Sequence, residues 1–136
     1  MASRRAGRRQ AIDVLYQADV TGRDPRVVLA GWAAAGKELH PFAEELGEGV
    51  TASRTLVDET IAKHAEHWSL ERMAAVDRTI LRLACFELIA GSPPGPVISE
   101  AVKAAKELST EDSGRFVNGV LGTIARERDA DEPHRT

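Results

Sequence analysis

The sequence predicts an all-α protein, and two observations on its apolar residues support this. Apolar side chains recur every three or four residues through much of the chain, as between residues 11 and 18, which is the spacing of one face of an amphipathic helix. Aromatic residues make up only 4% of the chain and alanine is abundant, whereas strands favour aromatic and β-branched residues. No apolar alternation is flanked by hairpin turn signals. We therefore expect about seven helices and no strand.

Residues that begin or interrupt helices set the expected boundaries of the first elements. Proline lacks the amide hydrogen that a first helical turn leaves unpaired, so Pro25 and Pro41 mark two helix starts. Gly47 and Gly49 lie inside the third expected helix and permit either a close helix approach or a kink. The loop at residues 91–96 contains three prolines and is expected to be non-helical. The helices expected before that loop span about residues 8–20, 25–36, 41–65, 69–73 and 76–90. The last of them is the most apolar, so we expect it at the centre of the fold.

Two further helices are expected on either side of a polar hinge near residues 108–114. Their apolar stripes run through residues 101–108 and 116–124. Ser99 and Ser113 are the expected N-caps, because a serine hydroxyl accepts a hydrogen bond from a free amide of the first turn. The core prediction that follows from the stripes is the burial of Ile80, Leu83, Ala84, Val120 and Leu121.

Length and composition predict one globular domain in the cytoplasm. The chain has 136 residues, of which 43% are apolar and 29% are charged, as in ordinary soluble domains. No apolar run approaches the roughly 20 residues of a membrane span, and no secretory signal is recognisable, so no membrane association is expected. The expected domain covers residues 1–128, with a flexible basic arm at residues 1–7 and a disordered polar tail at residues 129–136.

Positive charge is concentrated at the N-terminus. Residues 1–10 contain four arginines and no acid, which leaves a net charge of −7 on the rest of a chain whose total is −3. Arg8 and Arg9 lie in the first turn of the expected helix, where the helix dipole disfavours cations. An anionic partner would relieve that cost. An ordinary solvated tail is the alternative interpretation.

No group of reactive side chains indicates an enzyme or a metal site. His64 and His67 flank Glu66, but a third ligand and the His-Glu-x-x-His order of zinc proteases are missing. Cys85 lies in the most apolar helix without a histidine partner, so it is interpreted as a small core residue. We therefore expect a protein with no catalytic residue, no cofactor and no metal.

Three blocks of the chain carry a resemblance to a known family. They are RRQAIDVLYQADVTG at residues 8–22, AVDRTILRLACFEL at residues 75–88 and AVKAAKELSTEDSGRFVNGVLG at residues 101–122. Together and in this order they resemble the NusB family of transcription antitermination factors. The resemblance implies two packed three-helix groups. It also implies binding of the boxA element in the leader of ribosomal RNA transcripts, together with the small-subunit ribosomal protein NusE, within an RNA polymerase antitermination complex. A homodimer is a further possibility that the family raises.

The resemblance and the residue types together give a set of candidate RNA-binding residues. Single-stranded RNA is held by cations on its phosphates and by aromatic faces under its bases, and Tyr16 and Phe116 are the candidate aromatic residues. Phe116 also heads an apolar stripe, so core packing is its alternative role, and we expect one edge packed on Val120 and one face open. The full set is Arg4, Arg5, Arg8, Arg9, Gln10, Tyr16, Asp77, Lys103, Lys106, Asp112, Ser113, Arg115 and Phe116.

Two other classes of protein remain as alternatives. The same fold occurs as the N-terminal RNA-binding domain of RNA cytosine methyltransferases, but the sequence contains no cofactor domain, so a free-standing factor is expected. A purely structural helical dimerisation module is the third class. Affinity for boxA RNA would distinguish an antitermination factor from such a module. Activity with S-adenosylmethionine would identify a methyltransferase.

Overall fold

The computed structural model describes residues 3–130, and this range contains seven α-helices, one short 3₁₀ helix and no strand. The elements are α1 (Arg4–Thr21), α2 (Pro25–Ala34), α3 (Pro41–Ala52), α4 (Arg54–His64), η1 (Leu70–Arg72), α5 (Ala75–Ile89), α6 (Pro94–Leu108) and α7 (Glu111–Ala130). The all-α prediction is therefore confirmed. None of these helices is long and apolar enough to cross a membrane. Of the expected polar tail, residues 131–136 lie outside the described range.

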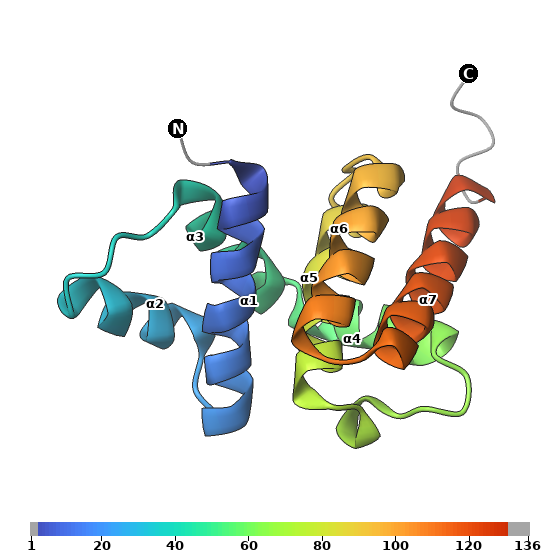
Figure 1. Cartoon of the computed structure of the whole chain (residues 1–136), viewed down its shortest axis with the longest axis horizontal. Helices are drawn as coiled ribbons and strands as arrows, with labels where there is room; N and C mark the ends of the chain where they lie inside the picture. The colour runs from blue at the N-terminus through green and yellow to red at the C-terminus, as the bar shows by residue number, and fades with distance from the viewer. Residues whose placement is uncertain (1–2, 131–136) are drawn as a thin grey trace.

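The helices form two groups that share α5. Helices α1, α2 and α3 pack on one another, and α4, α6 and α7 pack around α5, which also contacts α1 and α3 (Figure 1). The second group thus contains four helices rather than the expected three. The cause is Ser53, whose backbone angles of φ −106° and ψ 15° leave helical geometry. This residue divides the expected helix at residues 41–65 into α3 and α4, which belong to different groups.

The core lies along α5, as its apolar sequence predicted. Ile80, Leu83, Ala84, Val120 and Leu121 are all at most 5% exposed, so their predicted burial is confirmed. At Gly49 the structure decides between the two alternatives, because a Cβ atom there would lie 2.2 Å from the ring of Phe86. Glycine at this position permits the close approach of α3 to α5.

Several helix boundaries differ from the predicted ones. Helix α1 begins at Arg4 rather than near residue 8, because the Ser3 hydroxyl accepts a hydrogen bond from the amide of Ala6. Residues 4–7 of the expected flexible arm are therefore helical. The polar tail was expected from residue 129, but α7 continues through residue 130.

The other boundary errors concern the last two helices. Helix α6 begins at Pro94, inside the segment expected to be a loop, because prolines fit a first helical turn. Ser99 therefore lies within α6 and is not an N-cap. Ser113 also lies inside its helix, and the hydroxyl of Thr110 accepts the hydrogen bond from the amide of Ser113 instead. Leu108, expected on an apolar stripe, is 44% exposed.

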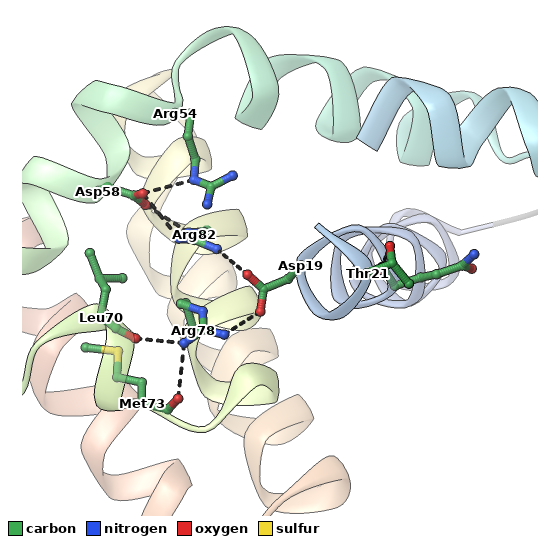
Figure 2. Close-up of polar contacts among 9 residues, drawn as sticks. Asp19, Thr21, Arg54, Asp58, Leu70, Met73, Arg78 and Arg82 are labelled. Atoms are coloured by element: carbon green, nitrogen blue, oxygen red, sulfur yellow. Dashed lines mark hydrogen bonds and ion pairs between the residues drawn. The ribbon is translucent and has the colours of Figure 1, made fainter. Parts of the chain in front are cut away.

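A network of charged side chains joins α1 to the second group (Figure 2). The carboxylate of Asp19 on α1 accepts hydrogen bonds from Arg78 at 2.5 Å and from Arg82 at 3.1 Å, both on α5. Arg82, only 8% exposed, also donates to Asp58 on α4 at 2.8 Å. Because the four side chains are largely withdrawn from water, this network fixes the end of α1 against α4 and α5.

Arg78 also holds the segment that precedes α5. Its guanidinium group donates to the backbone carbonyls of Leu70 at 2.8 Å and Met73 at 3.2 Å. These carbonyls belong to η1 and to the residue that follows it, so the loop between α4 and α5 is attached to the same network. The loop carries Trp68, which contributes to the candidate site described below.

The network predicts an acid-sensitive contribution of Asp19 to stability. Burial alone would raise the pKa of Asp19, but the hydrogen bonds and charges of Arg78 and Arg82 outweigh it, and the net pKa lies below its ordinary value. We expect Asp19→Asn to lower the free energy of unfolding by about 2–3 kcal/mol in urea denaturation at pH 7. This is less than the loss on breaking a fully buried pair, because the Asp19 side chain keeps 13% exposure.

The pH dependence gives this prediction its sign. A carboxylate with a depressed pKa stabilises the folded state above its unfolded pKa, and the contribution is lost as the pH falls below about 4. Between about pH 5 and about pH 3, the wild type should therefore lose more stability than Asp19→Asn. The control is Asp24→Asn, which removes an acid at the surface instead of one in the network. Asparagine keeps the N-cap on α2. Equal stability of Asp19→Asn and the wild type would contradict the structural role of the network.

Candidate nucleic-acid interface

Two exposed ion pairs connect the predicted basic face of α1 to α6. Arg5 binds both carboxylate oxygens of Glu100 at 2.9–3.2 Å, and Arg9 binds Glu107 at 2.6 Å. The hydrogen bond from Arg5 holds the pKa of Glu100 below its ordinary value. The side chains of Arg5 and Arg9 are 56% and 30% exposed, so water screens these pairs and other anions can reach the arginines.

Arg8 lies deeper than its neighbours on α1. Its guanidinium binds Glu87 of α5 at 2.9–3.1 Å through three hydrogen bonds, and the carboxylate side chain is only 3% exposed. Arg8 and Arg4 also stack on the ring of Phe42, with the guanidinium carbons 5.5 and 4.1 Å from the ring centre. Arg8 therefore serves the packing of α1 on α5, while Arg4 stays at the surface.

The two other candidates on α1 have different environments. The Gln10 side chain accepts a hydrogen bond from the amide of His40 at 2.7 Å and donates to the carbonyl of Glu38 at 3.0 Å. It thus fixes the loop between α2 and α3. Tyr16 is 40% exposed and lies seven residues after Arg9, which places it on the same face of the helix. Its ring is accessible at the surface.

A second cluster surrounds a pocket of about 350 Å³ at the hinge between α6 and α7. The pocket is lined by Trp68, Arg72, Met73, Ala74, Asp77, Asp112, Ser113 and Phe116. Four of these residues belong to the predicted set, and the fold brings Asp77 from the start of α5 against Asp112, Ser113 and Phe116 at the start of α7. The sequence placed these residues in separate blocks, so their proximity is a result of the fold.

The polar wall of this pocket is a chain of hydroxyl and carboxylate groups. Ser113 donates its hydroxyl hydrogen to Asp77 Oδ2 at 3.0 Å, and Thr110 donates to the Ser113 hydroxyl at 3.1 Å. Asp77 Oδ1 is buried and has no hydrogen-bond partner among residues 3–130. Asp112 is exposed and pairs with Arg115 on the next turn. The pocket therefore offers carboxylate acceptors from Asp77 and Asp112, beside the N–H donors of Arg72 and Trp68.

The aromatic wall consists of Phe116 and Trp68. Phe116 is half-buried against the core, and its ring meets the Trp68 ring edge to face with the centres 6.2 Å apart. The expectation of a partly packed, partly open Phe116 is confirmed in this respect. Trp68 is 53% exposed and was missed as a candidate, because it lies in the short segment between the helices expected at residues 41–65 and 69–73. A large aromatic residue in a polar segment between helices was the available signal.

The remaining predicted cations lie on the surface of α6 and α7. Lys103 and Lys106 are exposed on α6, and Lys106 is 3.9 Å from Glu111. Lys106 also packs its stem against Gly114, where a Cβ atom would lie 2.6 Å from the lysine Cγ. At the C-terminal end of α6, Glu107 pairs with Arg9 of α1. The pocket-lining residues Asp112 and Phe116 follow a few positions later in the sequence, at the start of α7.

His64 and Cys85, two of the candidate reactive side chains, have partners within the fold instead. His64 is hydrogen-bonded through Nδ1 to the carbonyl of Thr60 and through Nε2 to Glu127 at 2.7 Å, beside a cleft of about 600 Å³ between α4, α5 and α7. No group of three possible metal ligands occurs in the part of the chain that the structure covers. Burial raises the pKa of the Cys85 thiol to about 12, so it is not a nucleophile at neutral pH.

The fold and these sites are those of an all-helical protein with a basic face on α1 and an aromatic pocket lined by carboxylates. A family model described as the NusB family matches residues 5–126. The chain therefore belongs to the NusB family, which comprises transcription antitermination proteins. This confirms the family resemblance and the prediction of a protein without enzymatic activity.

Individual relatives agree with this assignment over nearly their whole length. The transcription antitermination protein NusB of Saccharopolyspora erythraea is 50% identical over 131 residues, which cover 92% of this chain and 88% of the relative. The structure of T. maritima NusB superposes with a TM-score of 0.80 at 32% identity, covering 93% and 92% of the two chains. A crystal structure of antitermination factors NusB and NusE in complex with dsRNA has the same TM-score at 29% identity, covering 91% of this chain and 96% of that chain.

Proposed function

We propose that this chain binds the boxA element of ribosomal RNA leader transcripts together with NusE and promotes read-through by RNA polymerase in the cytoplasm. Family membership supports the role in antitermination, and the similar complex of NusB, NusE and dsRNA supports both kinds of partner. The observation that carries the proposal is the pocket of Trp68 and Phe116, which is also lined by the carboxylates of Asp77 at the start of α5 and Asp112 at the start of α7.

The hinge pocket is suited to an unpaired base. Aromatic rings with open faces stack on bases that have left a duplex, and sequence-specific RNA recognition mostly uses such bases. Asp77 and Asp112 line the pocket with acceptors for the N–H groups on a base edge, and of the two carboxylates that of Asp112 is exposed. A single-stranded element such as boxA therefore fits this pocket better than a continuous duplex.

The basic face supplies the second half of the proposed interface. Arg4, Arg5 and Arg9 are accessible, and Lys103 and Lys106 extend the positive surface along α6. Cations on phosphates give affinity that depends on salt and not on sequence. Arg8 and Gln10 hold this face in position, Arg8 through its contact with Glu87 and Gln10 through its contact with the α2–α3 loop.

The test of the proposal is a binding titration with two fluorescently labelled single-stranded RNAs of equal length and composition, one containing a boxA-like sequence and one scrambled. We expect tighter binding of the boxA-like RNA by a factor of at least about ten, which one or two base contacts provide. Added NusE should tighten that binding further and leave the scrambled RNA nearly unchanged. Sedimentation of the free protein in the same buffer measures whether it is a monomer or the homodimer that the family raises.

Equal affinity for both RNAs, with and without NusE, would contradict the proposed function. Binding of the duplex form in preference to the single strand would contradict the role assigned to the hinge pocket. The methyltransferase-domain and dimerisation alternatives predict no dependence on NusE.

The role of Phe116 is tested by a second titration. Phe116→Ala should reduce affinity for the boxA-like RNA by about 1–3 kcal/mol, the value of one stacked base. Its effect on the free energy of unfolding should stay below the roughly 3–5 kcal/mol that a fully buried phenylalanine contributes, because Phe116 is only half-buried. Melting and RNA binding are measured on the same protein sample.

The matched control is Phe86→Ala. Phe86 is also half-buried, but its ring packs on Gly49 of α3 and does not line the hinge pocket. This variant should lose stability and keep its RNA affinity in the folded fraction. Unchanged RNA affinity of Phe116→Ala combined with a large loss of stability would make Phe116 a core residue.

A further inference from the structure

The exposed arginines of α1 that face α6 already bind anionic groups of the protein. Arg5 holds both oxygens of Glu100 through Nε and Nη2, and Arg9 holds Glu107 through Nη2. The first contact is the forked geometry in which a guanidinium group binds either a carboxylate or a phosphate. A phosphate and Glu100 therefore compete for the same atoms of Arg5.

The exposure of these pairs makes such an exchange feasible without unfolding. One side chain of each pair is largely exposed, Arg5 at 56% and Glu107 at 55%, while Glu100 and Arg9 keep 21% and 30% exposure. Ion pairs that water reaches in this way add little to stability. The neighbouring pair of Arg8 and Glu87 differs, because its carboxylate is 3% exposed and is bound by three hydrogen bonds. Arg8 can hold α1 in place while Arg5 and Arg9 change partners.

The exchange has a cost that depends on the glutamates. When an arginine moves to an RNA phosphate, its glutamate loses its counter-charge and remains on the adjacent turns of α6. The negative charges of the phosphate and the glutamate then lie on either side of one guanidinium group. Their repulsion weakens the net gain from the new contact. The paired Arg5 and Arg9 therefore contribute less to RNA affinity than two free arginines on α1 would.

We infer that Glu100 and Glu107 are built-in competitors of the RNA backbone, which lower the affinity of the basic face for any RNA. The inference rests on the proposed function and adds a regulation of its site by residues of α6. Because the face alone then binds weakly, stable binding depends on the base contacts of the hinge pocket and on the partner protein. The competition acts at the arginines, so it affects specific and unspecific RNA by the same factor.

The test uses the full chain with Glu100→Gln and Glu107→Gln, singly and combined, titrated with the boxA-like and the scrambled RNA at several salt concentrations. Each substitution should tighten the binding of both RNAs about two- to fivefold, the range that corresponds to one exposed ion pair. The dependence of log K on log salt should become steeper by up to about 0.7 per released arginine. In an Arg5→Gln background, Glu100→Gln should have a smaller effect than in the wild type.

The matched control is Glu59→Gln, which changes the net charge equally at an exposed position on α4. It should change neither affinity nor salt dependence to the same extent, and circular dichroism checks that all variants are folded. Affinity and salt slope equal to those of the control would overturn the inference. If the wild type binds neither RNA, the proposed function itself fails, which the wild-type titration alone reveals.

Discussion

The position of α1 depends on charged contacts with α5 at both ends of the helix. Near its start, Arg8 binds the nearly inaccessible carboxylate of Glu87, and near its end Asp19 binds Arg78 and Arg82. The two helices run in opposite directions (Figure 1), so the start of α1 meets the end of α5. Breaking one partner of such a pair leaves a charge that water reaches poorly. These contacts therefore fix the face that α1 presents to α6.

The proposed RNA interface follows from this fixed position. With α1 held on α5, Arg5 and Arg9 face the acids of α6, and the end of α6 leads into the hinge that carries Asp112 and Phe116. A rigid surface of this kind binds a flexible strand with less loss of entropy on the protein side. The glutamates on α6 limit the electrostatic part of that binding, so the aromatic pocket has the greater part in selecting RNA.

Local patterns in the sequence predicted the helices, and packing between distant segments decided what they could not predict. The period of apolar residues identified the buried face of α5, and Pro25 correctly marked the start of α2. The break at Ser53 was not predicted, because apolar spacing continues across it and the two halves separate only through packing on different helices. At the candidate site, residue types indicated cations and aromatic rings, but the partners of the arginines lie 79–98 residues away in the sequence. Trp68 was missed for the same reason, since only the fold places it beside Phe116.

One experiment tests most directly whether the basic face and the hinge pocket form a single RNA interface. It follows the guanidinium Nε–H signals of Arg5 and Arg9 and the indole N–H signal of Trp68 by NMR while boxA-like RNA is added. We expect all three signals to shift along one binding curve with one dissociation constant, while the signals of His64, in the cleft between α4 and α7, stay in place. Shifts centred on His64, with the arginine and indole signals unmoved, would contradict a single RNA interface.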